Sequence, residues 1–167
     1  EQDVFLFSRT IGANIAFGVW PDVEPEAIQR YAEEAQAHEF IMSFGAGYAT
    51  TVGERGVTLS GGERQRIAIA RAFMTDPRIL ILDDCFSSVD TNTEAEILEK
   101  IRPVIQGKTV LIIAHRISTL QWTDQIIVLH EGQIVERGTH EELLALEGRY
   151  AGLYQKQLLE EEIKEVS

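Results

Sequence analysis

The pattern of apolar and polar positions along the chain changes repeatedly between a helical period and a strand-like one. Apolar residues recur every three to four positions in stretches that predict helices, namely residues 25–35, 38–44, 63–74, 92–105 and 150–166. Two continuous apolar runs, Ile79–Leu82 and Thr109–Ala114, are typical of strands buried on both faces of a parallel sheet. Residues 125–130 and 133–137 alternate apolar and polar around Glu131-Gly132, which predicts a hairpin. The pattern therefore predicts an α/β fold.

A short serine-glycine loop precedes one of these helices. Ser60, Gly61 and Gly62 come directly before the run Glu63–Met74. A loop that opens a helix leaves backbone N–H groups without partners, and the helix dipole adds partial positive charge there. Glycines also let an anion approach the backbone closely. The segment therefore predicts a phosphate-binding site.

Two carboxylates follow the first apolar strand. Asp83 and Asp84 come directly after Ile79–Leu82, at the carboxyl end of a strand, where side chains border the crevice of an α/β sheet. A carboxylate in that place is a usual anchor for Mg²⁺ on a nucleotide. Ser-Gly-Gly alone is common in turns, but the helix, the strand and the two aspartates at this spacing together favour a nucleotide site over a purely structural role.

Composition and charge exclude several classes of protein. The 167 residues are 44% hydrophobic, which is enough for one domain with a core. The net charge of −12 argues against binding duplex DNA through its phosphates, so we expect no nucleic-acid partner. The single cysteine, Cys85, excludes a disulfide framework, and its position favours a packed thiol over a nucleophile. No apolar stretch approaches membrane-spanning length, so we expect the chain by itself to be soluble.

The segment LSGGERQRIAIARA followed by LILDD resembles the signature motif and the Walker B strand of ATP-binding cassette (ABC) ATPases. The resemblance implies ATP and Mg²⁺ as cofactors. It implies that Asp83 holds Mg²⁺ and that Asp84 orients the attacking water. It also implies contacts to the nucleotide held by a second such domain, made by the signature residues Ser60, Gly61, Gly62 and Glu63.

Three further segments extend this resemblance. Gln2, followed by D-V-F-L-F-S, resembles the Q-loop, whose Gln reaches Mg²⁺ and the attacking water; otherwise Gln2 is a solvated terminal residue. His115 follows TVLIIA at the spacing of the H-loop, whose His reaches the γ-phosphate, although a lone His after a strand is more often structural. Ser87–Asp90 occupies the place of the D-loop, which crosses the dimer interface. As bare sequence it is a helix entry with Asp90 or Thr91 as the cap, and both roles can hold at once.

The loop TVGERG before the signature is similar to the loop of exporter-type members that contacts the membrane domains. The resemblance makes Glu54 and Arg55 the contact residues, while without it a charged turn is an equally good interpretation. GTHEELL, with Thr139 in a capping box, strengthens the similarity to exporters.

Two departures from the family pattern limit what the chain is expected to do. No G-x-x-x-x-G-K-[ST] motif occurs in these residues, and that phosphate cradle supplies much of the nucleotide affinity. We therefore expect the chain alone to bind ATP weakly or not at all. Asp84 stands where the family usually has Glu, one methylene longer, as in the slowly hydrolysing site of some heterodimeric exporters.

The resemblance implies a partial P-loop NTPase core with a predominantly parallel sheet, plus a helical subdomain. Residues 1–75 would form the Q-loop and helical subdomain with the signature, and residues 76–167 the C-terminal part of the core. The implied function is ATP binding and hydrolysis in an exporter, at the cytoplasmic face of a membrane. The implied partners are a second nucleotide-binding domain, identical or not, and the transporter's transmembrane domains. Two alternatives stay open, a regulatory half with little hydrolysis and a chromosome-maintenance or DNA-repair ATPase.

Overall fold

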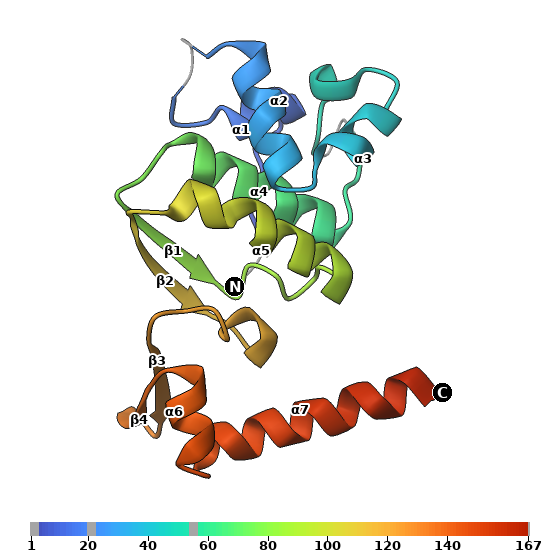
Figure 1. The fold of residues 1–167 in the computed structure, drawn as a ribbon. Coiled ribbons are helices and arrows are strands. Elements are labelled where there is room, and N and C mark those ends of the chain that lie inside the picture. Colours follow the sequence, from blue (N-terminus) through green and yellow to red (C-terminus); the bar gives the residue numbers. More distant parts are fainter. Residues whose placement is uncertain (1–3, 20–22, 54–56, 167) are drawn as a thin grey trace. The chain divides into compact units, whose positions relative to one another are not determined.

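The computed structural model describes residues 4–19, 23–53 and 57–166. The chain divides into two compact units, residues 1–113 and 114–167, coloured from blue to gold and from gold to red in Figure 1. Gln2, Glu54 and Arg55 lie outside the described residues. The division at residue 75 concerns the helical subdomain and the core, and it stays a prediction.

The first unit contains five α-helices, a short 3₁₀ helix and two strands among its described residues. In chain order these are α1 (Ile11–Ile15), α2 (Pro25–Glu34), α3 (His38–Ser43), η1 (Gly47–Ala49), α4 (Gly61–Met74), β1 (Ile79–Asp83), α5 (Thr91–Ile105) and β2 (Thr109–Ile113). Local chemistry sets several helix starts: Thr10 caps α1, Pro25 opens α2, and Asp90 caps α5. All the helices predicted in this part of the sequence are present. The five-residue α1 was not predicted, because it is too short to show a period.

Helix α4 forms the centre of the first unit. Helices α1 and α2 pack on it, and α2 also contacts α5 (Figure 1). Its apolar residues and those of its neighbours exclude water from a single core. The largest fully buried apolar side chains of this core are Ile11, Ile15, Ile41, Ile67, Phe73, Ile97 and Ile101.

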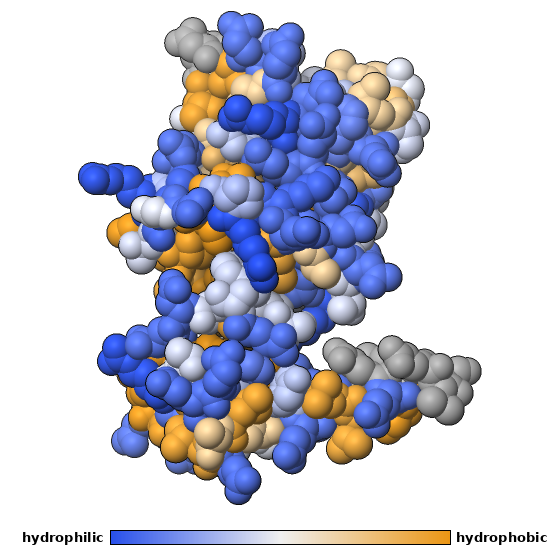
Figure 2. Space-filling view, in the orientation of Figure 1, coloured by the Kyte–Doolittle hydropathy of each residue, from blue (hydrophilic) through white to orange (hydrophobic). Residues whose placement is uncertain are grey.

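Strands β1 and β2 pair in parallel, with Ile79 opposite Thr109 and Asp83 opposite Ile113. Helices α4 and α5 lie along one side of them, and Leu80 and Leu82 are buried (Figure 1). The opposite side carries Ile79 and Leu111, which are 66% and 52% exposed, and apolar atoms gather there in Figure 2. The expectation that both strands are buried on both faces is therefore wrong for the described chain, because helices of this unit cover only one side of the pair.

The second unit is a hairpin with two helices. Its elements are η2 (Ile117–Thr119), β3 (Ile126–His130), β4 (Gln133–Gly138), α6 (His140–Ala145) and α7 (Arg149–Val166). The hairpin turn at Glu131-Gly132 has φ of +49° and +76°, the left-handed pair that a two-residue turn requires. Thr139 forms the predicted capping box with Glu142. The core of this unit consists of Ile117, Ile126, Leu143 and Tyr150.

No helix in the described part of the chain is both long enough and apolar enough to cross a membrane.

Candidate nucleotide-binding site

The signature loop, residues 59–63, is closed by its own hydrogen bonds. The Ser60 Oγ accepts from the Glu63 N–H at 3.2 Å, and the Glu63 Oε2 accepts from the Ser60 N–H at 2.7 Å. The Arg64 guanidinium donates to the Leu59 carbonyl at 2.8 Å. These three bonds fix the loop at the first turn of α4 and leave the Ser60 side chain exposed. Because the Ser60 Oγ accepts within the loop, its hydroxyl proton stays available to an acceptor outside it.

The loop also keeps donors that suit an anion. Gly61 and Gly62 are the first two residues of the 14-residue helix α4, where a backbone amide has no acceptor within the helix. Two such amides and a hydroxyl are the donor set that a phosphate oxygen binds. Glu63 takes the capping role in the loop, and its predicted contact with the nucleotide stays a prediction. These residues fit a nucleotide phosphate.

The carboxylate pair lies where β1 ends. Asp83 is exposed at the last position of the strand, and Asp84 leaves the strand with φ of +48°, a left-handed conformation that Asp adopts more readily than most residues. The Asp84 N–H donates to the Ile113 carbonyl at 2.9 Å, which ties this turn to the end of β2. No group of three or more metal-ligating side chains occurs among the described residues. Two carboxylates nevertheless suit Mg²⁺, which takes one or two of them together with phosphate oxygens and water.

The D-loop, residues 87–90, packs against the start of α4. The Gln65 Nε2 donates to the Ser87 Oγ at 2.9 Å, and the Gln65 Oε1 accepts from the Ser88 N–H at 2.9 Å. Gly62 lies so close that a Cβ there would stand 2.7 Å from the Ser88 carbonyl oxygen. The structure thus brings the signature loop and the D-loop of one chain into direct contact.

Asp90 ends the D-loop and caps α5. Its Oδ1 accepts from the Thr93 N–H at 3.0 Å. Hydrogen bonds from the backbone and the side chain of Thr93 lower the pKa of the Asp90 carboxyl below its usual value. Asp90 is therefore the helix cap that the sequence allowed, and its predicted role toward nucleotide stays a prediction.

A buried asparagine and a half-buried arginine, Asn14 and Arg71, were not singled out from the sequence. Asn14, fully buried in α1, bonds through its side chain to both backbone groups of Phe7, at 2.8 and 3.0 Å. Arg71 of α4 donates to the Asn14 carbonyl at 2.8 Å and to the Asn14 Oδ1 at 3.0 Å. Burial lowers the pKa of the Arg71 guanidinium. This pair fastens the segment that follows Gln2 to the signature helix.

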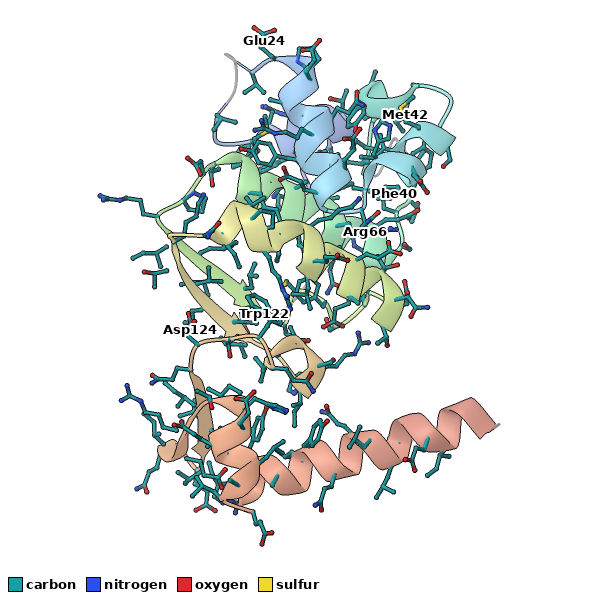
Figure 3. All side chains as sticks on the ribbon, in the orientation of Figure 1. Glu24, Phe40, Met42, Arg66, Trp122 and Asp124 are labelled. Atoms are coloured by element: carbon teal, nitrogen blue, oxygen red, sulfur yellow. The ribbon has the colours of Figure 1, made fainter. Side chains whose placement is uncertain are left out.

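Arg66 links helix α4 to α3 and to the segment that precedes it. Its guanidinium donates to the Gln36 carbonyl at 2.9 Å and lies 4.7 Å from the centre of the Phe40 ring (Figure 3). Arginine stacking on an aromatic face combines charge with apolar contact. Helix α4 is therefore held at its start by Gln65, in its first half by Arg66 and at its end by Arg71.

His115 belongs to the second unit, where its side chain is exposed. The Gln157 side chain of α7 holds the segment around it, because its Nε2 donates to the His115 carbonyl and its Oε1 accepts from the Ile117 N–H at 2.8 Å. Along the chain, His115 follows the end of β2, and β2 ends beside Asp83. Its predicted reach to the γ-phosphate stays a prediction. Gln157 had no sequence signal, since its partners lie about 40 residues away.

The Cys85 thiol follows the carboxylate pair and is largely buried. Burial raises its pKa to about 12, with the carboxylates of Glu94 and Asp84 adding to the shift. A thiol with this pKa is protonated at neutral pH and is a poor nucleophile. The interpretation of Cys85 as a packed thiol agrees with this environment.

A family model and several named relatives place the chain in one family. The model of the family described as "ABC transporter" matches residues 1–87. The ATP-dependent lipid A-core flippase of Chromohalobacter salexigens is 50% identical over 162 residues, which are 97% of this chain and 28% of the flippase. The putative multidrug export ATP-binding/permease protein YgaD of Bacillus subtilis is 50% identical over 153 residues, which are 92% of this chain and 26% of that protein.

A solved structure shows the same fold. The structure of a bacterial Atm1-family ABC exporter with ATP bound superposes with a TM-score of 0.88 and 43% sequence identity, over 95% of this chain and 28% of that one. The expected α/β fold of an ABC ATPase is thereby confirmed. The chain spans about a quarter of the length of the proteins it matches.

Proposed function

Because this chain belongs to the ABC transporter family, we propose that it is part of the ATP-hydrolysing motor of a membrane exporter. The observation that carries the proposal is the joining of the signature loop, the D-loop and the Asp83-Asp84 turn within one unit. An anion site at a helix start and a carboxylate pair at a strand end are the two halves of a phosphoryl-transfer site. The named relatives support export as the process that the motor drives.

The signature residues act on the nucleotide held by a second nucleotide-binding domain. The Ser60 hydroxyl and the Gly61 and Gly62 amides donate to its γ-phosphate, and the α4 dipole favours the negative charge. These donors are fixed before any nucleotide arrives, because the capping box already holds the loop. A preorganised donor set stabilises the charge that develops in the transition state without further rearrangement.

The carboxylate pair acts on the nucleotide of its own subunit. Asp83 holds Mg²⁺, which neutralises phosphate charge when it is bound. Asp84 accepts a hydrogen bond from the attacking water, Gln2 orients the same water and the metal, and His115 donates to the γ-phosphate. Asp84 is shorter than the usual Glu, and a carboxylate displaced from its in-line position loses rate steeply. This subunit therefore hydrolyses slowly at its own site and completes the faster site of its partner.

The motor joins two further components. The D-loop faces the second nucleotide-binding domain, and Glu54 and Arg55 contact the transmembrane domains. Closure of the two domains on ATP and their release after hydrolysis shift the membrane domains between two conformations. The chain works at the cytoplasmic face of that membrane. A regulatory half with little turnover is the second candidate, and Asp84 is the feature that favours it.

The test measures ATP turnover by the full-length protein that carries this chain, in lipid vesicles. Asp83→Asn keeps the size of the side chain but removes a metal-binding charge, so we expect turnover to fall by about a hundredfold or more. Asp124→Asn makes the same change at an exposed residue of the second unit and should leave turnover unaltered. Equal turnover by both variants would refute the assignment of Asp83. A wild-type protein that binds ATP without turnover would favour the regulatory half.

A further inference from the structure

The amide side chain of Gln65 lies between helix α4 and the D-loop. Gln65 is only 7% exposed, and both polar atoms of its amide are bonded to the D-loop. A buried amide costs free energy unless all its polar atoms are satisfied. An apolar residue would fill a helix–loop contact more simply, so the amide serves to fix the D-loop backbone.

The bonds continue from the D-loop to the carboxylate turn. The Ser87 N–H donates to the Asp84 carbonyl at 3.2 Å, and the Ser87 Oγ accepts from Gln65. Two hydrogen bonds through Ser87 therefore join α4 to the backbone of Asp84. The backbone of Gly62 also packs directly against the D-loop, because nothing larger than a hydrogen atom fits between its Cα and the Ser88 carbonyl oxygen.

We infer that Gln65 is a positioning residue that couples the two half-sites of one chain. On one side lies the loop that serves the partner's nucleotide, and on the other lies the turn that serves the chain's own. The Gln65 amide and Ser87 hold residues 84–88 in fixed register with the signature loop, so the geometry of one half-site depends on that of the other. This inference rests on the proposed function, since it assigns a role to each side of the link.

Two variants of Gln65 and one control separate this role from simple packing. Gln65→Met keeps the length and shape of the side chain and removes both hydrogen bonds. Gln65→Glu keeps an acceptor for the Ser88 N–H and offers a second oxygen to the Ser87 hydroxyl. Gln29→Met makes the same chemical change at an exposed residue of α2, whose amide donates to Glu33.

The first measurement is amide hydrogen exchange in the 167-residue chain. Loss of the acceptor should raise the exchange rate of the Ser88 amide about tenfold in Gln65→Met relative to wild type. The Gln29→Met control should leave that rate unchanged. An unchanged Ser88 rate in Gln65→Met would overturn the assigned contact, whatever the function of the protein.

The second measurement is ATP hydrolysis by the full-length protein. Gln65→Met should lower kcat about tenfold with KM within about twofold, because a misplaced group acts on the transition state rather than on binding. Gln65→Glu should restore kcat most of the way to wild type. Wild-type kcat in Gln65→Met, or equal losses in the Met and Glu variants, would overturn the inference. Absence of hydrolysis by the wild-type protein would instead refute the proposed function.

Discussion

The two glycines of the signature loop predict different responses to the same substitution. Gly61 and Gly62 are adjacent in sequence, both lie in the first turn of α4, and both face Ser88. A Cβ on Gly62 would stand 2.7 Å from the Ser88 backbone oxygen, which cannot move without displacing the D-loop. A Cβ on Gly61 would stand 3.2 Å from the Ser88 side chain, which is exposed and needs to yield only slightly.

The expected change in folding free energy is the sum of two opposing contributions. Alanine in place of glycine favours a helix by up to about 1 kcal/mol in free energy of folding. Overpacking against a fixed neighbour costs about 1–3 kcal/mol. We therefore expect Gly62→Ala to destabilise the chain by about 0.5–2 kcal/mol, and Gly61→Ala to change its stability by less than about 0.5 kcal/mol.

Urea unfolding of the 167-residue chain, followed by circular dichroism, measures both variants against wild type. The midpoint should fall for Gly62→Ala and stay near wild type for Gly61→Ala. Equal midpoints, or a lower midpoint for Gly61→Ala, would refute the close approach of α4 to the Ser88 backbone.

Three other predictions follow from the same structure. Asn14→Ala removes the side-chain bonds to both backbone groups of Phe7 and one acceptor of the half-buried Arg71, so the urea midpoint should fall by an amount equivalent to about 2–4 kcal/mol; a loss below 1 kcal/mol would contradict the network. The Cys85 pKa of about 12 against 9 when unfolded means about a thousandfold less thiolate in the folded chain at pH 8.5, so iodoacetamide should alkylate it far faster in urea. Because folding raises this pKa, the protonated Cys85 thiol contributes its full share of folding stability below pH 9, and that contribution is lost as the pH rises toward 12. Equal alkylation rates with and without urea would disprove the burial of Cys85. Asp84→Glu should raise ATP turnover of the full-length protein, at some cost in stability because φ at this position is +48°; unchanged turnover would show that Asp84 does not limit its site.

The sequence predicted the elements that carry strong local signals. Helix α4 was found because its apolar residues recur with a helical period over a sufficient length, and strand β1 because it is a continuous apolar run. The capping box at Thr139 and the hairpin turn at Glu131 were found because their chemistry is local. The same locality explains the signature loop, whose hydrogen bonds lie within five residues of one another.

The residues that join these elements could not be predicted in the same way. Gln65 bonds to residues 22 and 23 positions away, and Arg71 bonds to Asn14 across 57 positions. One signal was available, since Gln65 lies four and eight residues before the buried Ile69 and Phe73 and thus on the inner face of its helix. A polar residue on such a face needs a buried partner, but only the fold identifies that partner as the D-loop.

The measurement that tests the account most directly is a calorimetric titration of MgATP into the 167-residue chain and into the full-length protein. The chain carries a signature loop and a carboxylate pair, but no G-x-x-x-x-G-K-[ST] cradle occurs in its sequence. We predict no detectable heat of binding for the chain and saturable binding for the full-length protein. Binding of ATP to the chain with micromolar affinity, near one nucleotide per chain, would contradict the account, because these residues would then form a complete nucleotide site of another kind.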